Sequence, residues 1–161
     1  MKLLFMDVDG TLTDGKIYIG CDGENMKAFN VKDGYAIHNI CPKYDVIPII
    51  ITSRNSEIVK RRAIELGIEE LHQGIVNKKE SMIHICEKYN KHLGANNRII
   101  DTIYIGDDVP DLECMQIAEV RGCPSDACAI VKENADYISV KEGGVGAVRE
   151  FVDWLISSGK V

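Results

Sequence analysis

The stretch that decides the fold is LLFMDVDGT, from Leu3 to Thr11. Its apolar first half is typical of a strand that is buried on both faces of a sheet, so we predict a strand over residues 3–8. Asp7 and Asp9 lie two positions apart, and on an extended backbone their carboxylates point the same way. Gly10 then permits a tight turn. The sequence therefore brings two carboxylates to one spot at the end of a strand.

Strand-like runs alternate with helical patterns along the rest of the chain. The runs cover residues 46–52, 102–105, 119–122 and 137–140, and helical spacing of apolar residues covers 56–66, 80–93, 111–117 and 145–156. Ser56 is a candidate N-cap for its helix, and Gly67 is a candidate helix end. We predict a single α/β domain over residues 1–161, with a Rossmann-like, mainly parallel sheet and helices on both faces. In such a sheet the active site lies beyond the carboxyl ends of the strands.

Residues 15–31 (GKIYIGCDGENMKAFNV) interrupt this alternation directly after the first acidic motif. Two β-prone arms flank Cys21-Asp22-Gly23-Glu24, in which Asp-Gly is a turn signal. The pattern predicts a short β-hairpin flap.

The composition restricts the partners that the chain can bind. A formal net charge of -6 argues against a sequence-independent nucleic-acid binder, but a bound divalent cation can still attract an anionic substrate. No apolar run approaches the length of a membrane span, which argues against a membrane protein. The six cysteines form no CxxC pair, so we expect reduced thiols in a cytoplasmic protein, with a zinc site as the alternative.

Asp7 and Asp9 offer the two acids that phosphomonoester hydrolysis needs. One carboxylate can attack phosphorus and form a covalent intermediate. A second carboxyl group can protonate the departing sugar oxygen and later deprotonate the attacking water. The alternative is an ordinary Asp-Gly turn after a strand.

A second strand-like run, IYIGDDVPD from Ile103 to Asp111, also ends in carboxylates. Asp107 and Asp111 are four positions apart and share a face if a helix begins here. Oxygen ligands around a phosphate suit Mg²⁺. An acidic helix start explains Asp108 by itself, but it does not explain two acidic strand ends in one chain.

Two further motifs suit a phosphoryl group. Thr52 and Ser53 close the run at 46–52 and offer a hydroxyl group and backbone N–H groups. A lysine follows Asn77, and its ammonium group can neutralise charge that develops on the phosphoryl group. The spacing alone does not choose between Lys78 and Lys79.

In this order, the motifs resemble the haloacid dehalogenase superfamily: DVDGT, ITS, a lysine, and GDD with a further Asp. The acid two residues after the first Asp resembles the phosphatase branch, and the hairpin in place of an inserted cap domain resembles the capless subclass. Closer still, nearly the full chain resembles the family of 3-deoxy-D-manno-octulosonate 8-phosphate (KDO 8-phosphate) phosphatases. The matching stretches are DVDGTLTDGKIYIG, GENMKAFNVKDGYAI, IITSR, the QG…NK segment, YIGDD and GGVGAVREFVDWLI.

The resemblance implies a role for each matching residue. It implies Asp7 as the nucleophile, Asp9 as the acid/base, and Lys78 rather than Lys79 as the catalytic lysine. Mg²⁺ would be held by Asp7, the backbone carbonyl of Asp9, and Asp107. The substrate would be a sugar-acid phosphate, whose carboxylate suits arginine. Its contacts would be Asp9, Asn30, Val31, Lys32, Asp33, Gly34, Thr52, Ser53, Arg54, Arg62 and Lys78.

The same resemblance implies a homotetramer in which hairpins pack together and neighbouring subunits partly cover each active site. The Gly143-Gly144-Val145-Gly146 loop would belong to that cover, or it would be a flexible turn before a helix. The family commonly has arginine at the position of His38 and glycine at that of Ser53. Two alternatives are a phosphatase for nine-carbon ulosonate 9-phosphates and a non-catalytic assembly module like those appended to CMP-sialate synthetases.

Overall fold

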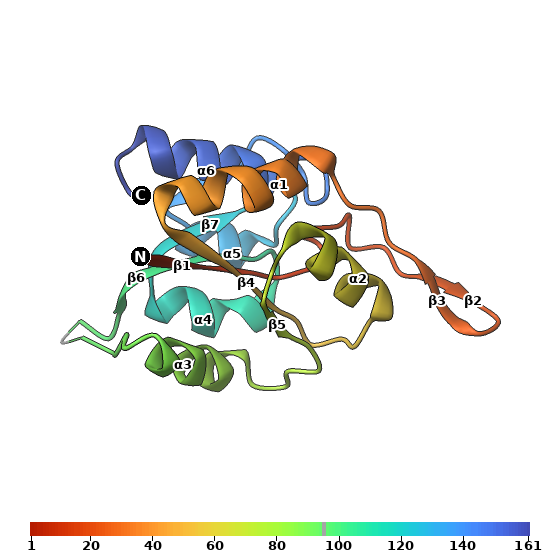
Figure 1. Ribbon diagram of the computed structural model, residues 1–161, viewed down its shortest axis with the longest axis horizontal. Coiled ribbons are helices and arrows are strands. Elements are labelled where there is room, and N and C mark those ends of the chain that lie inside the picture. Colours follow the sequence, from red (N-terminus) through yellow and green to blue (C-terminus); the bar gives the residue numbers. More distant parts are fainter. Residues whose placement is uncertain (95) are drawn as a thin grey trace.

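The computed structural model describes residues 1–94 and 96–161. At its centre is a six-stranded parallel sheet with the order β5-β4-β1-β6-β7-β8 (Figure 1). The strands are β1 (Lys2–Met6), β4 (Val46–Ile51), β5 (Glu70–His72), β6 (Ile99–Ile105), β7 (Ala118–Cys123) and β8 (Tyr137–Ile138). The predicted α/β class with a parallel sheet is confirmed, whereas a single domain over residues 1–161 stays a prediction.

Helices cover both faces of the sheet, because apolar side chains alternate along β1. Leu4 and Met6 pack in one core cluster with the π-helical turn (Ala36–Ile40) that follows α1 (Val31–Tyr35), and with α2 (Glu57–Leu66) and α6 (Ala147–Ser157). Leu3 and Phe5 point to the other face, where the cluster is completed by α3 (Lys78–Lys88), α4 (Leu112–Ile117) and α5 (Ala129–Asn134) (Figure 1). All four of these β1 side chains are fully buried.

Several predicted boundaries shift in the structure. The first strand ends at Met6 rather than residue 8, which places Asp7 in the loop that follows. Helix α3 begins at Lys78 rather than residue 80, because the Asn77 side chain caps it by accepting from the backbone of Glu80. Helix α2 agrees with prediction: Ser56 caps its start, and Gly67 adopts a left-handed conformation at its end.

The sequence did not reveal β5, α5 or α1. It also did not reveal the stretch after α1, which continues as a π-helical turn (Ala36–Ile40) and a 3-10 turn (Cys41–Tyr44). Strand β5 has only three residues and α5 has six, so neither carries a recognisable period.

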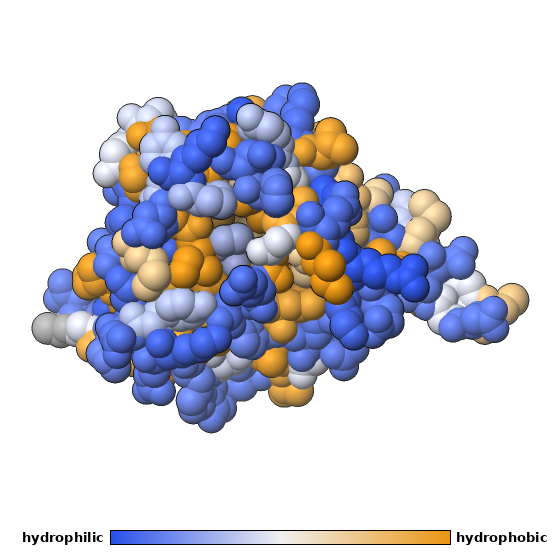
Figure 2. Space-filling view, viewed as in Figure 1, coloured by the Kyte–Doolittle hydropathy of each residue, from blue (hydrophilic) through white to orange (hydrophobic). Residues whose placement is uncertain are grey.

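The predicted hairpin is present as β2 (Tyr18–Gly20) and β3 (Gly23–Met26), which pair antiparallel. Gly23 has a φ of 111° and opens β3, so the turn itself is Cys21-Asp22. The hairpin projects from the body of the protein (Figures 1 and 2). Ile19 and Met26 are 76% and 52% exposed on it. Among the described residues, no helix combines the length and apolar character that crossing a bilayer requires.

Candidate active site

The carboxyl ends of three adjacent strands bring the predicted motifs together. Strand β1 lies between β4 and β6, and Met6 is in register with Ile50 on one side and with Ile105 on the other. The loops that follow these strands therefore meet at one edge of the sheet. Together with Lys78 at the start of α3, they line a cavity of about 180 Å³. Its walls are Asp7, Asp9, Thr52, Ser53, Arg54, Lys78, Asp107, Asp108, Pro110 and Asp111.

Lys78 is the lysine that the structure places among these carboxylates. Its Nζ lies 2.8 Å from Oδ1 of Asp7 and 2.8 Å from Oδ1 of Asp111, and its side chain is 4% exposed. Burial opposes the charged form of Lys78, but the two carboxylates outweigh burial and raise its pKa to about 12. Lys78 is therefore a fixed cation in this cavity, and Lys79 is not among the residues that line it.

Asp111 holds Lys78 in place. Its Oδ1 accepts from Lys78 and, at 2.7 Å, from the Tyr104 hydroxyl group. Its Oδ2 accepts from the backbone N–H groups of Asp107 and Asp108 at 3.0 and 3.3 Å. Gly106 is required beside it, because a Cβ there would lie 2.4 Å from the Asp111 carboxyl group. The sequence had suggested only that Asp111 shares a face with Asp107, and its buried partner Tyr104 was missed.

Asp107 lies against the loop that follows Asp7. Its Oδ1 accepts from the Thr11 hydroxyl group at 3.0 Å. A Cβ at Gly10 would lie 2.1 Å from Oδ2 of Asp107, and Gly10 has a φ of 98°, so only glycine fits there. Burial, together with Asp7 and Asp111, raises the pKa of Asp107 to about 7.

These carboxylates form a group that fits a divalent cation. One oxygen from each of Asp7, Asp107 and Asp111 lies within 4.8 Å of the others. Burial and the Asp111 charge raise the pKa of Asp7 to about 7 despite Lys78, since one ammonium group cannot balance three carboxylates. Asp111 already accepts from four donors, whereas Asp7 and Asp107 accept fewer. Asp7 and Asp107 are therefore the better metal ligands.

Asp9 lies at the mouth of the same cavity, where its side chain is 19% exposed. Its Oδ1 pairs with the Lys27 ammonium group, and its Oδ2 lies 3.7 Å from Nε of Arg54. Lys27 pairs in turn with Glu24 of β3 at 3.0 Å. The sequence pattern does not indicate a role for Lys27 or Glu24, because the contact of Lys27 with Asp9, and that of Glu24 with Lys27, depend on how the hairpin is placed.

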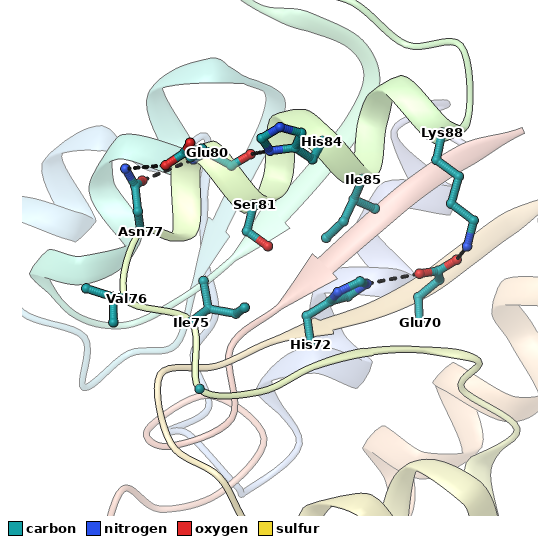
Figure 3. Close-up of a pocket in the computed structure, with 11 residues that line it drawn as sticks. Glu70, His72, Ile75, Val76, Asn77, Glu80, Ser81, His84, Ile85 and Lys88 are labelled. Carbon is teal, nitrogen blue, oxygen red and sulfur yellow. Dashed lines mark hydrogen bonds and ion pairs between the residues drawn. The ribbon is translucent and has the colours of Figure 1, made fainter.

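A larger cavity, of about 530 Å³, lies between β5 and α3 (Figure 3). Glu70 accepts there from His72, Lys88 and Tyr89, and although burial opposes its charge, these donors lower its pKa to about 2. Glu80 accepts from Asn77 at 3.2 Å. Because both carboxylates are already paired, this cavity lacks the group of under-neutralised acids that marks the strand-end site.

No family model matches the chain, but individual proteins do. It is 39% identical over 156 residues to 3-deoxy-D-manno-octulosonate 8-phosphate phosphatase of Escherichia coli K12, covering 97% of this chain and 79% of that one. The enzyme of the same name from Salmonella typhi is 40% identical over 157 residues, with the same coverage. The chain belongs to the KDO 8-phosphate phosphatase family.

Solved structures agree with this membership. The Moraxella catarrhalis KDO 8-phosphate phosphatase, in complex with magnesium ion, phosphate ion and KDO, has a TM-score of 0.89 and 37% identity, and the match covers 98% of this chain and 87% of that one. The cobalt-bound Haemophilus influenzae phosphatase has a TM-score of 0.88 at 32% identity, covering 99% of this chain and 90% of that one. This KDO 8-phosphate phosphatase family member is a phosphoric monoester hydrolase of the haloacid dehalogenase superfamily.

The remaining predicted substrate contacts of this family member do not line the cavity of Asp7. Asn30 caps α1 by accepting from the backbone of Lys32 at 2.8 Å, and Val31 is 78% exposed beside it. Arg62 lies against Gly34, where a Cβ would approach its guanidinium group to 2.4 Å. Their roles in binding stay predictions.

Asp33, another predicted contact, has a structural partner. It is buried, and its Oδ1 accepts from the backbone N–H of Arg149 at the start of α6 at 2.7 Å. Burial raises its pKa to about 6. The Asp33 side chain thus joins α1 to α6.

The glycine loop and His38 also have defined backbone contacts in the structure. Gly144 donates to the backbone carbonyl of Thr11 at 3.1 Å, and a Cβ at Gly143 would lie 1.9 Å from the carbonyl oxygen of Gly10. The glycine loop therefore supports the turn that follows Asp7, rather than forming only a flexible connection. His38 bonds through Nδ1 to the backbone carbonyl of Leu66 at 3.0 Å and does not line the cavity.

Proposed function

We propose that this chain is a Mg²⁺-dependent phosphatase that hydrolyses KDO 8-phosphate to KDO and phosphate through a phospho-aspartyl intermediate. The observation that carries the proposal is the position of Asp7, which Lys78 holds at a strand end beside Asp107 and Asp9. The relatives named above are KDO 8-phosphate phosphatases, and one of their structures contains magnesium, phosphate and KDO.

In this mechanism Asp7 attacks phosphorus, and the oxygen on C8 of the sugar departs. Lys78 keeps the Asp7 carboxylate oriented, because its ammonium group is fixed from behind by Asp111. Asp9 gives a proton to the departing oxygen and then takes one from the water that hydrolyses the phospho-aspartate. Thr52 and Ser53 line the same cavity and donate to phosphoryl oxygens.

The site suits Mg²⁺ on its own residues. Asp7 and Asp107, with the backbone carbonyl of Asp9, would hold the ion, and its charge would balance that of the substrate phosphate and the carboxylates. The raised pKa values of Asp7 and Asp107 mark a cluster with too little positive charge of its own.

The sugar acid is recognised by the groups around the cavity mouth. Arg54 is half exposed there, and its guanidinium group suits the substrate carboxylate. Exposed Val31 and Lys32, with their neighbours Asn30 and Gly34, bind substrate at the edge that a second subunit covers. The active unit is a homotetramer whose hairpins pack together, which buries Ile19 and Met26.

The two alternatives have less support. A nine-carbon ulosonate 9-phosphate phosphatase is not favoured, because the curated relatives named above act on KDO 8-phosphate by name. A non-catalytic module is not favoured, since a degenerate copy would lose carboxylates that this chain keeps around one cavity. A cytoplasmic location stays a prediction from the sequence.

Phosphate release from a panel of esters tests this function. The panel contains KDO 8-phosphate, a nine-carbon ulosonate 9-phosphate and p-nitrophenyl phosphate, each with Mg²⁺ and with EDTA. We expect the highest kcat/KM for KDO 8-phosphate, and only with the metal. A preference for the nine-carbon ester would overturn the proposed substrate, and no release from any ester would overturn the phosphatase.

A further inference from the structure

Lys27 follows β3 on the return arm of the hairpin, and it is a lysine whose side chain is buried. Its side chain is 1% exposed, in contrast to Lys16 at the base of the other arm, which is 72% exposed. Removing an ammonium group from water is costly unless anions surround it. Lys27 meets that condition through two carboxylates, Asp9 and Glu24. It is therefore part of a built arrangement and not a solvated surface lysine.

Glu24 is the second carboxylate that contacts Lys27, and it also has partners in the main body of the protein. It accepts from the Ser56 hydroxyl group, pairs with Lys27 at 3.0 Å, and lies 3.9 Å from Nη2 of Arg54. Ser56 also caps α2, so Glu24 ties the hairpin to a helix of the main body. This anchoring fixes where the Lys27 ammonium group lies relative to the cavity.

Asp9 is held between two cations from different elements. Lys27 of the hairpin arm contacts its Oδ1, and Arg54 beyond β4 approaches its Oδ2. Asp9 follows β1 in a loop, where a short side chain would otherwise exchange rotamers. A group that delivers a proton must lie within hydrogen-bond reach of the departing oxygen. The contact with Lys27 keeps one carboxylate oxygen fixed and leaves the other directed to the Arg54 side.

We propose that Lys27 is a positioning residue that orients Asp9 for proton delivery to the departing oxygen, and that Glu24 orients Lys27. This inference rests on the proposed function, because it assigns Asp9 the acid/base role. It also gives the hairpin a task within its own subunit, separate from any packing between subunits. Lys27 acts through Asp9 and makes no bond to phosphorus.

The proposal has a signature that a merely structural role lacks. A departing sugar alkoxide needs a proton, whereas p-nitrophenolate is stable enough to leave without one. Misplacing Asp9 therefore slows hydrolysis of alkyl esters far more than that of p-nitrophenyl phosphate. A collapsed hairpin would slow both equally. If Lys27 instead bound the sugar acid directly, its removal would raise KM for KDO 8-phosphate and would affect simple alkyl and aryl esters equally.

The experiment measures kcat/KM with saturating Mg²⁺ for KDO 8-phosphate, a simple alkyl phosphate and a series of aryl phosphates. The variants are Lys27→Met, Lys27→Arg and Glu24→Gln, with Lys16→Met as the matched control on the exposed lysine. For Lys27→Met we expect a loss on the order of 100-fold on both alkyl esters and less than about fivefold on p-nitrophenyl phosphate. Lys27→Arg should recover most of the alkyl rate, Glu24→Gln should show the same trend more weakly, and Lys16→Met should match wild type.

If Lys27→Met lost the same factor of kcat/KM on alkyl and aryl esters while the wild type was active, this inference would be overturned. The proposed function would still stand. A change confined to KM for KDO 8-phosphate would overturn this inference as well. If the melting temperature of Lys27→Met is well below that of wild type, the test relies on Glu24→Gln and Lys27→Arg. Their kcat/KM values for alkyl and aryl esters are then compared in the same way. A wild-type chain that releases no phosphate from any ester would overturn the proposed function and this inference together.

Discussion

Lys78 and Asp7 form a buried ion pair of 2.8 Å at the carboxyl end of the central strand, and Asp111 holds the lysine from its other side at the same distance. The pair fixes the proposed nucleophile, which follows β1, by a contact from a different element, since Lys78 begins α3. A nucleophile held in this way needs little reorganisation before it attacks.

Asp7→Asn keeps the shape of the side chain and removes the attacking anion. We expect phosphate release to fall by more than about 1000-fold, because the covalent route is lost. The matched control is Asp14→Asn, in which a carboxylate of the same loop region that pairs with Lys16 is changed. Activity of Asp7→Asn within about tenfold of wild type would contradict the covalent mechanism.

Lys78→Met removes the cation between two buried carboxylates. Loss of one member of a buried ion pair leaves uncompensated charge, so we expect the free energy of unfolding to drop by about 3 kcal/mol. Activity should fall on the order of 100-fold or more, for aryl and alkyl esters alike. Urea unfolding and phosphate release provide the two measurements, with Lys79→Met as the control. If Lys78→Met changed neither the free energy of unfolding nor phosphate release, the ammonium group would have no role.

The acids around the metal site give the metal-free protein a pH-dependent stability. Burial and the neighbouring carboxylates raise the pKa of Asp7 and of Asp107 from 3.8 to about 7. Between these values the folded chain keeps protons that the unfolded chain has released, so the free energy of unfolding falls as pH rises. In EDTA we expect the melting temperature to drop on the order of 5 °C between about pH 5 and pH 8.

Mg²⁺ should restore most of that loss at the higher pH, because it binds the ionised carboxylates. Asp107→Asn should flatten the melting profile in EDTA and weaken the response to Mg²⁺. It should also reduce activity to near the level of wild type in EDTA. Ca²⁺ should inhibit, since it favours a looser and higher coordination than Mg²⁺. A melting temperature in EDTA that rises from acid to neutral pH would show that these acids are not the dominant groups.

The parts of this site that the sequence predicts are those that local patterns encode. LLFM followed by DVDGT predicts a buried strand and the two carboxylates beyond it, and both are confirmed as positions in the fold. Ser56 and Gly67 mark the ends of α2 for equally local reasons, a side-chain cap and a left-handed residue. These features need no knowledge of what packs against them.

The missed parts depend on contacts between distant segments. Asp9 and Lys27 are 18 positions apart, and Lys78 and Asp111 are 33 apart. Nothing in the pattern around Lys27 distinguishes it from the exposed Lys16. Only the path of the hairpin, which returns its second arm to the mouth of the cavity, turns Lys27 into a buried partner of Asp9. The acid cluster and a lysine after Asn77 could be predicted from the sequence, but the contact of Lys78 with Asp111 and that of Lys27 with Asp9 could not.

The last prediction concerns the hairpin as an assembly surface. Ile19 of β2 is 76% exposed, and Met26 of β3 is 52% exposed. An isolated two-stranded ribbon cannot bury this apolar surface by itself. We expect sedimentation at micromolar concentration to show a closed symmetric oligomer, with a tetramer as the proposed state. Ile19→Glu should dissociate it and reduce turnover of KDO 8-phosphate more than that of p-nitrophenyl phosphate. The control is Ile100→Glu, which changes an exposed isoleucine (58%) at the start of β6 in the central sheet, away from the hairpin. A wild-type monomer with full activity on KDO 8-phosphate would show that one subunit completes the pocket by itself.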